Sequence, residues 1–308
     1  MSLEFSAFID LPQHLQPGGF DHAAVHSSRG RLYVAHTANN SLEVIDCVKD
    51  RYLRSIPGLP GVAGALVSEE RDLVFTSNRG EDMVGVFSPA DETSLFKIPV
   101  GVHPNGLAFD PGRSLLLAAN VGNPDLLGSF TLSLVDIQRR EMVSSIPVPG
   151  RTRWTVFAAQ PGWFYVNIAD PPQIIVIDAA EIHRIHHTIA IPAAGPHGLD
   201  LDVQDGRLFC ACDGARLVVL KIYTEKATAE AELSGAPDVI FLNPALQRLY
   251  VAVGDPGVID VFALQPLQRV ETVPTEAGAH TLGFDPARNK VYAFLPKTHR
   301  AIVFEDRE

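Results

Sequence analysis

The chain has 308 residues, of which 46% are hydrophobic and 20% are charged, as in an ordinary globular protein. Its formal charge of −11, without a cluster of lysines and arginines, argues against a nucleic-acid partner, because phosphates are neutralised by a basic surface. No apolar run reaches the roughly 20 residues of a membrane-spanning helix, so we expect no membrane insertion.

The N-terminus and the cysteines bear on the compartment. Residues 1–3 are not followed by the charged and apolar segments of a secretion signal, so the sequence as it stands predicts a cytoplasmic protein. The location would be periplasmic or otherwise exported if a leader has been removed. The three cysteines form no disulfide framework. Cys210 and Cys212 lie two residues apart in a predicted strand, so we expect both on one buried face.

The stretch 101–150 shows the unit from which the chain is built. It contains four short apolar segments, at 105–110, 114–120, 131–136 and 141–148, separated by turn residues such as Asp110, Pro111 and Gly112. The second segment is apolar throughout, as expected of a strand buried on both faces. Because one four-stranded sheet cannot bury both faces alone, each copy of the unit must pack against its neighbours.

The same second strand recurs seven times in chain order. The copies begin at positions that step by 42, 42, 48, 44, 41 and 42 residues, which is the period of a four-stranded propeller blade. Their first residues are Tyr33, Phe75, Leu117, Tyr165, Phe209, Tyr250 and Tyr292.

Third strands follow every copy, but a fourth strand follows only six of them, because the chain ends at Glu308. The segment 5–11 at the other end has the character of a fourth strand, so we expect it to complete the last blade and close the ring. The sequence therefore predicts an all-β fold: one domain, 1–308, forming a seven-bladed β-propeller of four-stranded antiparallel blades closed by the N-terminal strand.

The recurring Tyr-Val-(Ala/Thr)-(Asn/His) strand, preceded by Gly-x-x-Pro and an Asp-Pro turn, resembles the YVTN-type β-propeller repeat. The resemblance covers essentially the whole chain and implies a seven-bladed ring, related in architecture to seven-bladed lactonases and quinoprotein dehydrogenase-like propellers. The tetrapeptide is degraded in the last four copies, and no Cys-x-x-Cys-His haem-attachment motif is present. The resemblance therefore bears on fold more than on function.

Polar residues converge where the seven first strands begin, at one mouth of the central channel. The alignment places Asp21, Ala63, Asn105, Arg153, His197, Asp238 and His280 at equivalent positions. The neighbouring residues His22, His103 and Trp154 join them. The predicted ligand-binding residues are Asp21, His22, Asn105, Arg153, Trp154, His197, Asp238 and His280.

Three interpretations of this mouth are open. In the first, His22, His197 and His280 hold one divalent metal ion, with Asp21 or Asp238 as an optional further ligand, and a metal-bound water serves hydrolysis. In the second, Arg153 and the histidines bind a small anionic metabolite, with the guanidinium as a bidentate clamp. In the third, the polar groups only hydrate the channel and satisfy the backbone.

The loops between second and third strands form the rim around this mouth. The longest, at 120–129, carries Leu126 and Leu127, which could be an apolar lid or a contact for a partner. The segment 181–187 is rich in histidine, but it lies on the opposite face and is expected to be a turn anchored by Ile182 and Ile185.

No Walker loop, nucleophile elbow, His-Glu-x-x-His motif or dinucleotide fingerprint is present, so we expect no nucleotide cofactor. The function expected is therefore binding of a small molecule at the channel mouth, in one version as a metal-dependent, lactonase-like hydrolase or a lyase. The alternative is a non-catalytic recognition or scaffold propeller that binds a protein or surface polymer through its rim loops. The fold does not decide between them.

Overall fold

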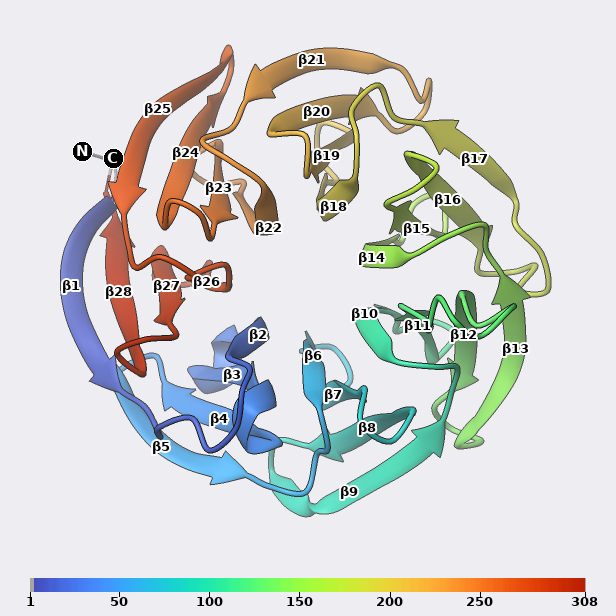
Figure 1. Ribbon diagram of the computed structural model, residues 1–308, viewed down its shortest axis with the longest axis horizontal. Coiled ribbons are helices and arrows are strands. Elements are labelled where there is room, and N and C mark those ends of the chain that lie inside the picture. Colours follow the sequence, from blue (N-terminus) through green and yellow to red (C-terminus); the bar gives the residue numbers. More distant parts are fainter. Residues whose placement is uncertain (1–2, 308) are drawn as a thin grey trace.

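A computed structural model describes residues 3–307, which form seven four-stranded antiparallel sheets around a central axis (Figure 1). Blade one contains β2 (Phe20–His26), β3 (Arg31–His36), β4 (Ser41–Asp46) and β5 (Arg51–Ile56), with short 3-10 turns at Ser27–Arg29 and Thr37–Asn39. Blade two contains β6 (Val62–Ser68), β7 (Leu73–Asn78), β8 (Met83–Ser88) and β9 (Asp91–Pro99). Blade three contains β10 (Pro104–Asp110), β11 (Leu115–Asn120), β12 (Thr131–Asp136) and β13 (Glu141–Pro147).

The remaining blades continue around the ring in chain order. Blade four contains β14 (Thr152–Ala158), β15 (Trp163–Ile168), β16 (Gln173–Asp178) and β17 (His187–Ala190). Blade five contains β18 (Pro196–Asp202), β19 (Arg207–Cys212), β20 (Arg216–Lys221) and β21 (Ala227–Glu232). Blade six contains β22 (Pro237–Asn243), β23 (Arg248–Val253), β24 (Val258–Leu264) and β25 (Leu267–Pro274). Blade seven contains β26 (Leu282–Asp285), β27 (Lys290–Leu295), β28 (Arg300–Asp306) and β1 (Leu3–Asp10).

Blade seven is assembled from both ends of the described chain, as the sequence predicted. Strand β1 pairs antiparallel with β28, from Leu3 opposite Asp306 to Asp10 opposite Arg300. In Figure 1 the blue β1 lies along the outer edge of the red β28. The pairing covers the outer edge of β28, which would otherwise expose a row of unpaired backbone groups.

The hydrophobic core is divided into seven clusters, and each lies between two neighbouring blades. In one of them Tyr33 of blade one packs with Val62 and Phe87 of blade two, and all three side chains are almost completely buried. Burying an aromatic or aliphatic side chain of this size contributes about 1.5–3 kcal/mol. Each blade therefore depends on its neighbours for stability.

Aspartates at strand ends fix the turns within the blades. The Asp46 carboxylate accepts backbone hydrogen bonds from Val48 and Lys49, at 3.0 and 3.2 Å. The same arrangement, with the carboxylate accepting a backbone N–H two or three residues later, recurs at Asp110, Asp136, Asp178, Asp202 and Asp285. These residues stabilise tight turns.

The first strand of six blades carries one extra residue near its start. In blade one, Phe20 lies opposite His36 and Ala23 lies opposite Val34, so three steps along β2 match two along β3. Equivalent shifts occur in β6, β10, β14, β18 and β22. A bulge of this kind changes which side chains face a given side of the strand. As a result, residues three apart, at the second and fifth positions of the strand, both face the central axis.

The predicted burial of the cysteines is confirmed. Cys210 and Cys212 are completely buried, and their sulfurs lie 3.8 Å apart without a disulfide. Burial raises the pKa of Cys210 well above its ordinary value, so the thiol is unreactive.

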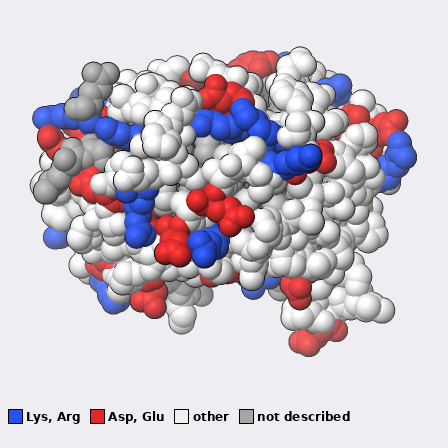
Figure 2. All heavy atoms as spheres, turned by 90° about the horizontal axis from the view of Figure 1, so that it is seen from above, with Lys and Arg blue, Asp and Glu red and all other residues white. Residues whose placement is uncertain are grey.

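The outer surface carries charges of both signs. On the face seen in Figure 2, basic and acidic side chains lie next to one another rather than in separate areas. Within residues 3–307, no helix is long and apolar enough to cross a membrane.

Candidate functional site

The residues aligned from the sequence occupy equivalent places at one mouth of the central channel. Each is the second residue of its innermost strand in blades one to six, and His280 precedes β26 by two residues. The set is Asp21, Ala63, Asn105, Arg153, His197, Asp238 and His280. The bulge described above follows this position directly, so it turns these side chains toward the axis.

His197 is the centre of the contacts at the mouth. Its Nδ1 lies 2.7 Å from Asp213 Oδ1 and its Nε2 lies 3.2 Å from Asp238 Oδ1. Arg153 donates to Asp213 Oδ2 from Nη2 at 3.2 Å, and its Nη1 lies 3.2 Å from His197 Nε2. His280 Nε2 is 4.0 Å from the other oxygen of Asp238. Asp213, which links Arg153 to His197, was not among the predicted residues.

These carboxylates keep His197 protonated at neutral pH. Burial alone would lower the pKa of His197, but the charge of Asp238 and the hydrogen bonds with Asp213 and Asp238 raise it to about 9. Burial would raise the pKa of Asp238, but His197 holds it well below the ordinary value. The contact between Arg153 Nη1 and the imidazolium brings two donors together, and the two carboxylates supply the compensating charge. His197 can therefore donate a proton to a bound anion, but it cannot accept one.

Two more arginines, which the sequence reasoning missed, lie at the same mouth. Arg79 directly follows β7, and its Nη1 is 3.4 Å from Asp21 Oδ2. Arg151 precedes β14, and its exposed side chain makes no hydrogen bond or ion pair with the residues that the structure describes. Partial desolvation and the charges of Arg153 and Arg79 lower the pKa of Arg151. The positive charges of these three guanidinium groups therefore repel one another, and the nearby carboxylates compensate that charge only in part.

His22 and Trp154, the residues after Asp21 and Arg153, close the channel on the inner side of the mouth. Their rings come from blades one and four, on opposite sides of the axis in Figure 1, and their centroids are 4.1 Å apart. Trp154 also packs against the clusters of blades four and five and of blades six and seven. Burial lowers the pKa of His22 although Asp21 Oδ1 lies 3.3 Å from its Nε2. The two rings therefore form a neutral plug across the channel.

Asn105 faces the mouth but joins none of these contacts. Its side-chain oxygen is buried without a hydrogen-bond partner, while its backbone oxygen accepts from Ser77 Oγ at 2.7 Å. This oxygen is therefore a buried acceptor that the described residues leave unsatisfied.

The predicted metal site is not supported. Among residues 3–307, no group of three or more His, Cys, Asp or Glu side chains is placed to hold a metal ion. The physical reason lies in His22 and His197. His22 is 5% exposed and packs against Trp154. Both nitrogens of His197 are engaged by carboxylates, so the protonated imidazole has no free lone pair for a metal shared with His280.

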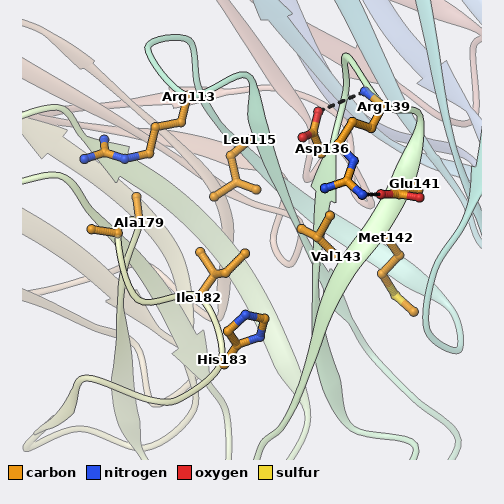
Figure 3. A pocket seen from close by; sticks show the side chains of 11 residues that line it. Arg113, Leu115, Asp136, Arg139, Glu141, Met142, Val143, Ala179, Ile182 and His183 are labelled. Atoms are coloured by element: carbon orange, nitrogen blue, oxygen red, sulfur yellow. Dashed lines mark hydrogen bonds and ion pairs between the residues drawn. The ribbon is translucent and has the colours of Figure 1, made fainter.

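The histidine-rich segment 181–187 forms a turn, as expected, with Ile182 and Ile185 packed on the core between blades three and four. His183 lines a cavity of about 630 Å³ there, together with Met142 and Arg139 (Figure 3). His187 instead forms an ion pair with Glu225 of blade five. The two histidines therefore contact different partners and do not form a common site.

A second group of histidines, also missed, lies at the seam between blades seven and one. The ring of His14 is 4.9 Å from that of His36 and 4.4 Å from that of His299. Each has one buried ring nitrogen without a hydrogen-bond partner. Burial and the two neighbouring imidazoles lower the pKa of His14. This group packs against Phe20, which directly precedes the mouth residue Asp21.

The fold is shared with solved structures of very different sequence. The chain is similar to a chain of hydrazine synthase from Kuenenia stuttgartiensis, with a TM-score of 0.81 and 14% identity over 95% of this chain and 96% of that one. It is also similar to a chain of the mitotic checkpoint complex, with a TM-score of 0.83 and 9% identity over 99% and 92% of the two chains. No family model and no curated protein matches the sequence. At these identities the likeness concerns the fold alone, and the protein is a seven-bladed β-propeller.

Proposed function

We propose that the protein binds a small anionic molecule, a carboxylate or a phosphate ester, at the channel mouth. The observation that carries this proposal is the surplus of guanidinium donors. The Nε atoms of Arg79 and Arg153 are buried without a hydrogen-bond partner. The exposed side chain of Arg151 has no partner among the described residues and is open to a ligand. Buried donors without partners are costly, so a ligand that accepts from them gains affinity.

The chemistry of the mouth suits an anion with further polar groups. A guanidinium binds carboxylate or phosphate oxygens through two parallel hydrogen bonds. Asp213 orients Arg153 from one side, and the His197 imidazolium adds a positive charge beside it. The free oxygen of Asn105 and the carboxylate of Asp238 would accept from a hydroxyl group on the same ligand. We therefore favour a hydroxylated carboxylate over a simple inorganic anion.

Isothermal titration calorimetry tests the proposal. Citrate, malate and inorganic phosphate would be titrated into the protein and into its Arg151→Gln and Arg153→Gln variants. Loss of one charged hydrogen bond is worth about 1.5–3 kcal/mol, so each variant should bind at least one of these anions roughly 10- to 100-fold more weakly.

Arg216→Gln is the matched control, because Arg216 is exposed on β20 and pairs with Glu232 at 3.5 Å, away from the mouth. It should bind like the unmodified protein. Equal binding by all four proteins, or no binding of any anion, would contradict the proposal.

A second candidate function, recognition of a protein or surface polymer through the rim, is favoured by one observation. Leu127 is fully exposed and Leu126 is half exposed, on a loop held by its own hydrogen bonds. Asn123 and Ser129 bond one another in both directions, at 2.8 and 2.7 Å. A preorganised loop presents apolar side chains at low entropic cost. Capture of a partner that survives Arg151→Gln but is lost when 123–127 are deleted would favour this role.

We also propose that the repeats are of the YVTN type, supported by the buried aromatic residue at the third position of most second strands, such as Tyr33 and Tyr250. Lactonase-like hydrolysis or lyase chemistry stays a prediction. The support for it is limited to a protonated His197 that could act as a general acid on a bound anion.

A further inference from the structure

Below the His22–Trp154 plug the channel widens into a cavity of about 590 Å³. Its walls are the innermost strands of the blades, and it extends to the turns that follow them, where Glu69, Glu70 and Val203 line it. These turns lie at the ends of the first strands, so this cavity, which we call the chamber, opens on the face opposite the mouth. The plug separates the two compartments.

One ring of residues in the chamber wall is apolar except at one place. In blades one to six, the second residue of the innermost strand lies at the mouth. The fifth residue of the same strand lines the chamber in all six blades. They are Ala24, Leu66, Ala108, Val156, Asp200 and Phe241. Asp200 therefore carries the one carboxyl group among these six residues, and the other five are apolar.

Asp200 keeps acceptor capacity toward the chamber. Its Oδ1 accepts from the backbone N–H of Leu201 and its Oδ2 from that of Leu242, both at 2.7 Å. An ionised carboxylate has about four acceptor sites, so about two remain. Burial raises the pKa of Asp200 to about 6. The two backbone hydrogen bonds oppose this increase, and the charge of Asp202 adds to it. At pH 7 the group is mostly a half-buried anion, and it forms no ion pair with the residues that the structure describes.

We propose that the chamber binds an organic cation, an ammonium group on an apolar body, with its charge at Asp200. Aromatic rings of Phe109, Phe241 and Phe284 line the same cavity, and aromatic faces attract ammonium groups. Glu69 and Glu70 at the opening favour entry of a cation over an anion. This ligand and this end of the channel are distinct from those of the anion site at the mouth.

The hydrogen bond from the backbone N–H of Leu242 does not require a charged acceptor at position 200. A neutral acceptor would satisfy the same backbone donor without the cost of burying a charge. The charge is useful only if a cation compensates it.

A matched series of three ligands tests the proposal by calorimetry: 4-phenylbutylamine, 4-phenylbutanol and 4-phenylbutyrate. They share one apolar body and carry a positive, a neutral and a negative head. We expect the amine to bind at least tenfold more tightly than the alcohol, and the carboxylate not to bind in the chamber. Asp200→Asn should remove the tenfold preference for the amine and leave binding of the alcohol unchanged.

Two further measurements keep the test decisive if Asp200→Asn folds poorly. In the unmodified protein, affinity for the amine should fall as the pH is lowered from 8 to 5, because Asp200 becomes protonated, while affinity for the alcohol stays constant. The other titratable groups lining the chamber are His22, Glu69 and Glu70. A Glu69→Gln, Glu70→Gln variant should keep the pH dependence.

Ala24→Phe fills the chamber from blade one and should abolish binding of both the amine and the alcohol. Equal affinity for amine and alcohol, or an amine that binds Asp200→Asn as tightly as the unmodified protein, would overturn the proposal. Asp200→Asn should keep any anion binding at the mouth, so failure here and failure of the anion site remain distinguishable.

Discussion

The mouth and the chamber are built from the same innermost strands, but their chemistry is opposite. At the second position six of the seven aligned residues are polar or charged, and the exception is Ala63. At the fifth position of the six full-length strands, five residues are apolar and the exception is Asp200. Strict alternation would turn positions three apart to opposite faces of a strand. The extra residue between them allows one strand to serve both compartments.

The plug makes this contrast possible. A continuous water-filled channel would solvate Asp200 and remove its pKa shift, since that shift arises from burial. The His22–Trp154 stack restricts solvent exchange between the ends, so each compartment keeps its own dielectric environment. Two binding sites of opposite preference then fit along one axis.

The largest effect is expected from breaking the plug. Trp154→Ala removes a ring that packs on two inter-blade clusters, and should lower the free energy of unfolding by about 3 kcal/mol. It should also connect the compartments, so that an anion at the mouth alters binding of the amine. Chemical denaturation and paired titrations measure both. Unchanged stability together with independent sites would show that the stack does not separate the compartments.

Removing the centre of the mouth should have a smaller effect that depends on pH. The folded-state pKa of His197, about 9, lies above its unfolded value of about 6.5, so its stabilising contribution is complete below pH 6.5 and is lost as the pH rises through 9. His197→Ala should therefore cost about 2 kcal/mol at pH 6, since it removes the contacts with Asp213 and Asp238 and leaves them only Arg153 and His280. The deficit, measured by denaturation, should shrink above pH 9. A deficit that is constant with pH would mean that His197 is neutral in the folded protein.

Changes at the rim should leave both compartments intact. Leu127→Ser alters a fully exposed side chain, and the free energy of unfolding should change by less than about 0.5 kcal/mol. Binding of anions and of the amine should stay the same. A clear loss of either would place the rim loop in the ligand sites.

The smallest effect is expected from chelation. Because both nitrogens of His197 are engaged, adding EDTA should not shift the melting temperature. Elemental analysis should give the same metal content for the unmodified protein and for a His197→Ala, His280→Ala variant. Stoichiometric metal that disappears in the variant would restore the metal interpretation and contradict the charge network described here.

The fold could be predicted from the sequence because its signals are local and repeated. The spacing from Tyr33 to Phe75 and onward gives the blade count, and turn aspartates such as Asp110 mark strand ends. The third strand of the last copy has no fourth strand after it, which predicts closure by the N-terminal segment. The strand bounds differ by one or two residues, as at β1, which spans Leu3–Asp10 rather than 5–11. Tertiary packing decides those ends.

The site could be predicted only in part, because it depends on geometry across the ring. Alignment placed Arg153, His197 and Asp238 together correctly. Arg79 and Asp213 were missed although each is the first residue after a second strand, and aligning that loop position would have revealed them. The metal interpretation stays a prediction without support from the structure, and sequence spacing cannot show that His22 turns onto Trp154. The bulges and the stack follow from the assembled ring.

The pairing of β1 with β28 has a consequence for biosynthesis. Strand β1 is made first, and its partner is translated nearly 300 residues later. At about 5–20 residues per second, an amphipathic segment waits on the order of 15–60 s with its edge open. Ring assembly is therefore a late, all-or-none event, and a nascent chain stalled before residue 300 should attract chaperones.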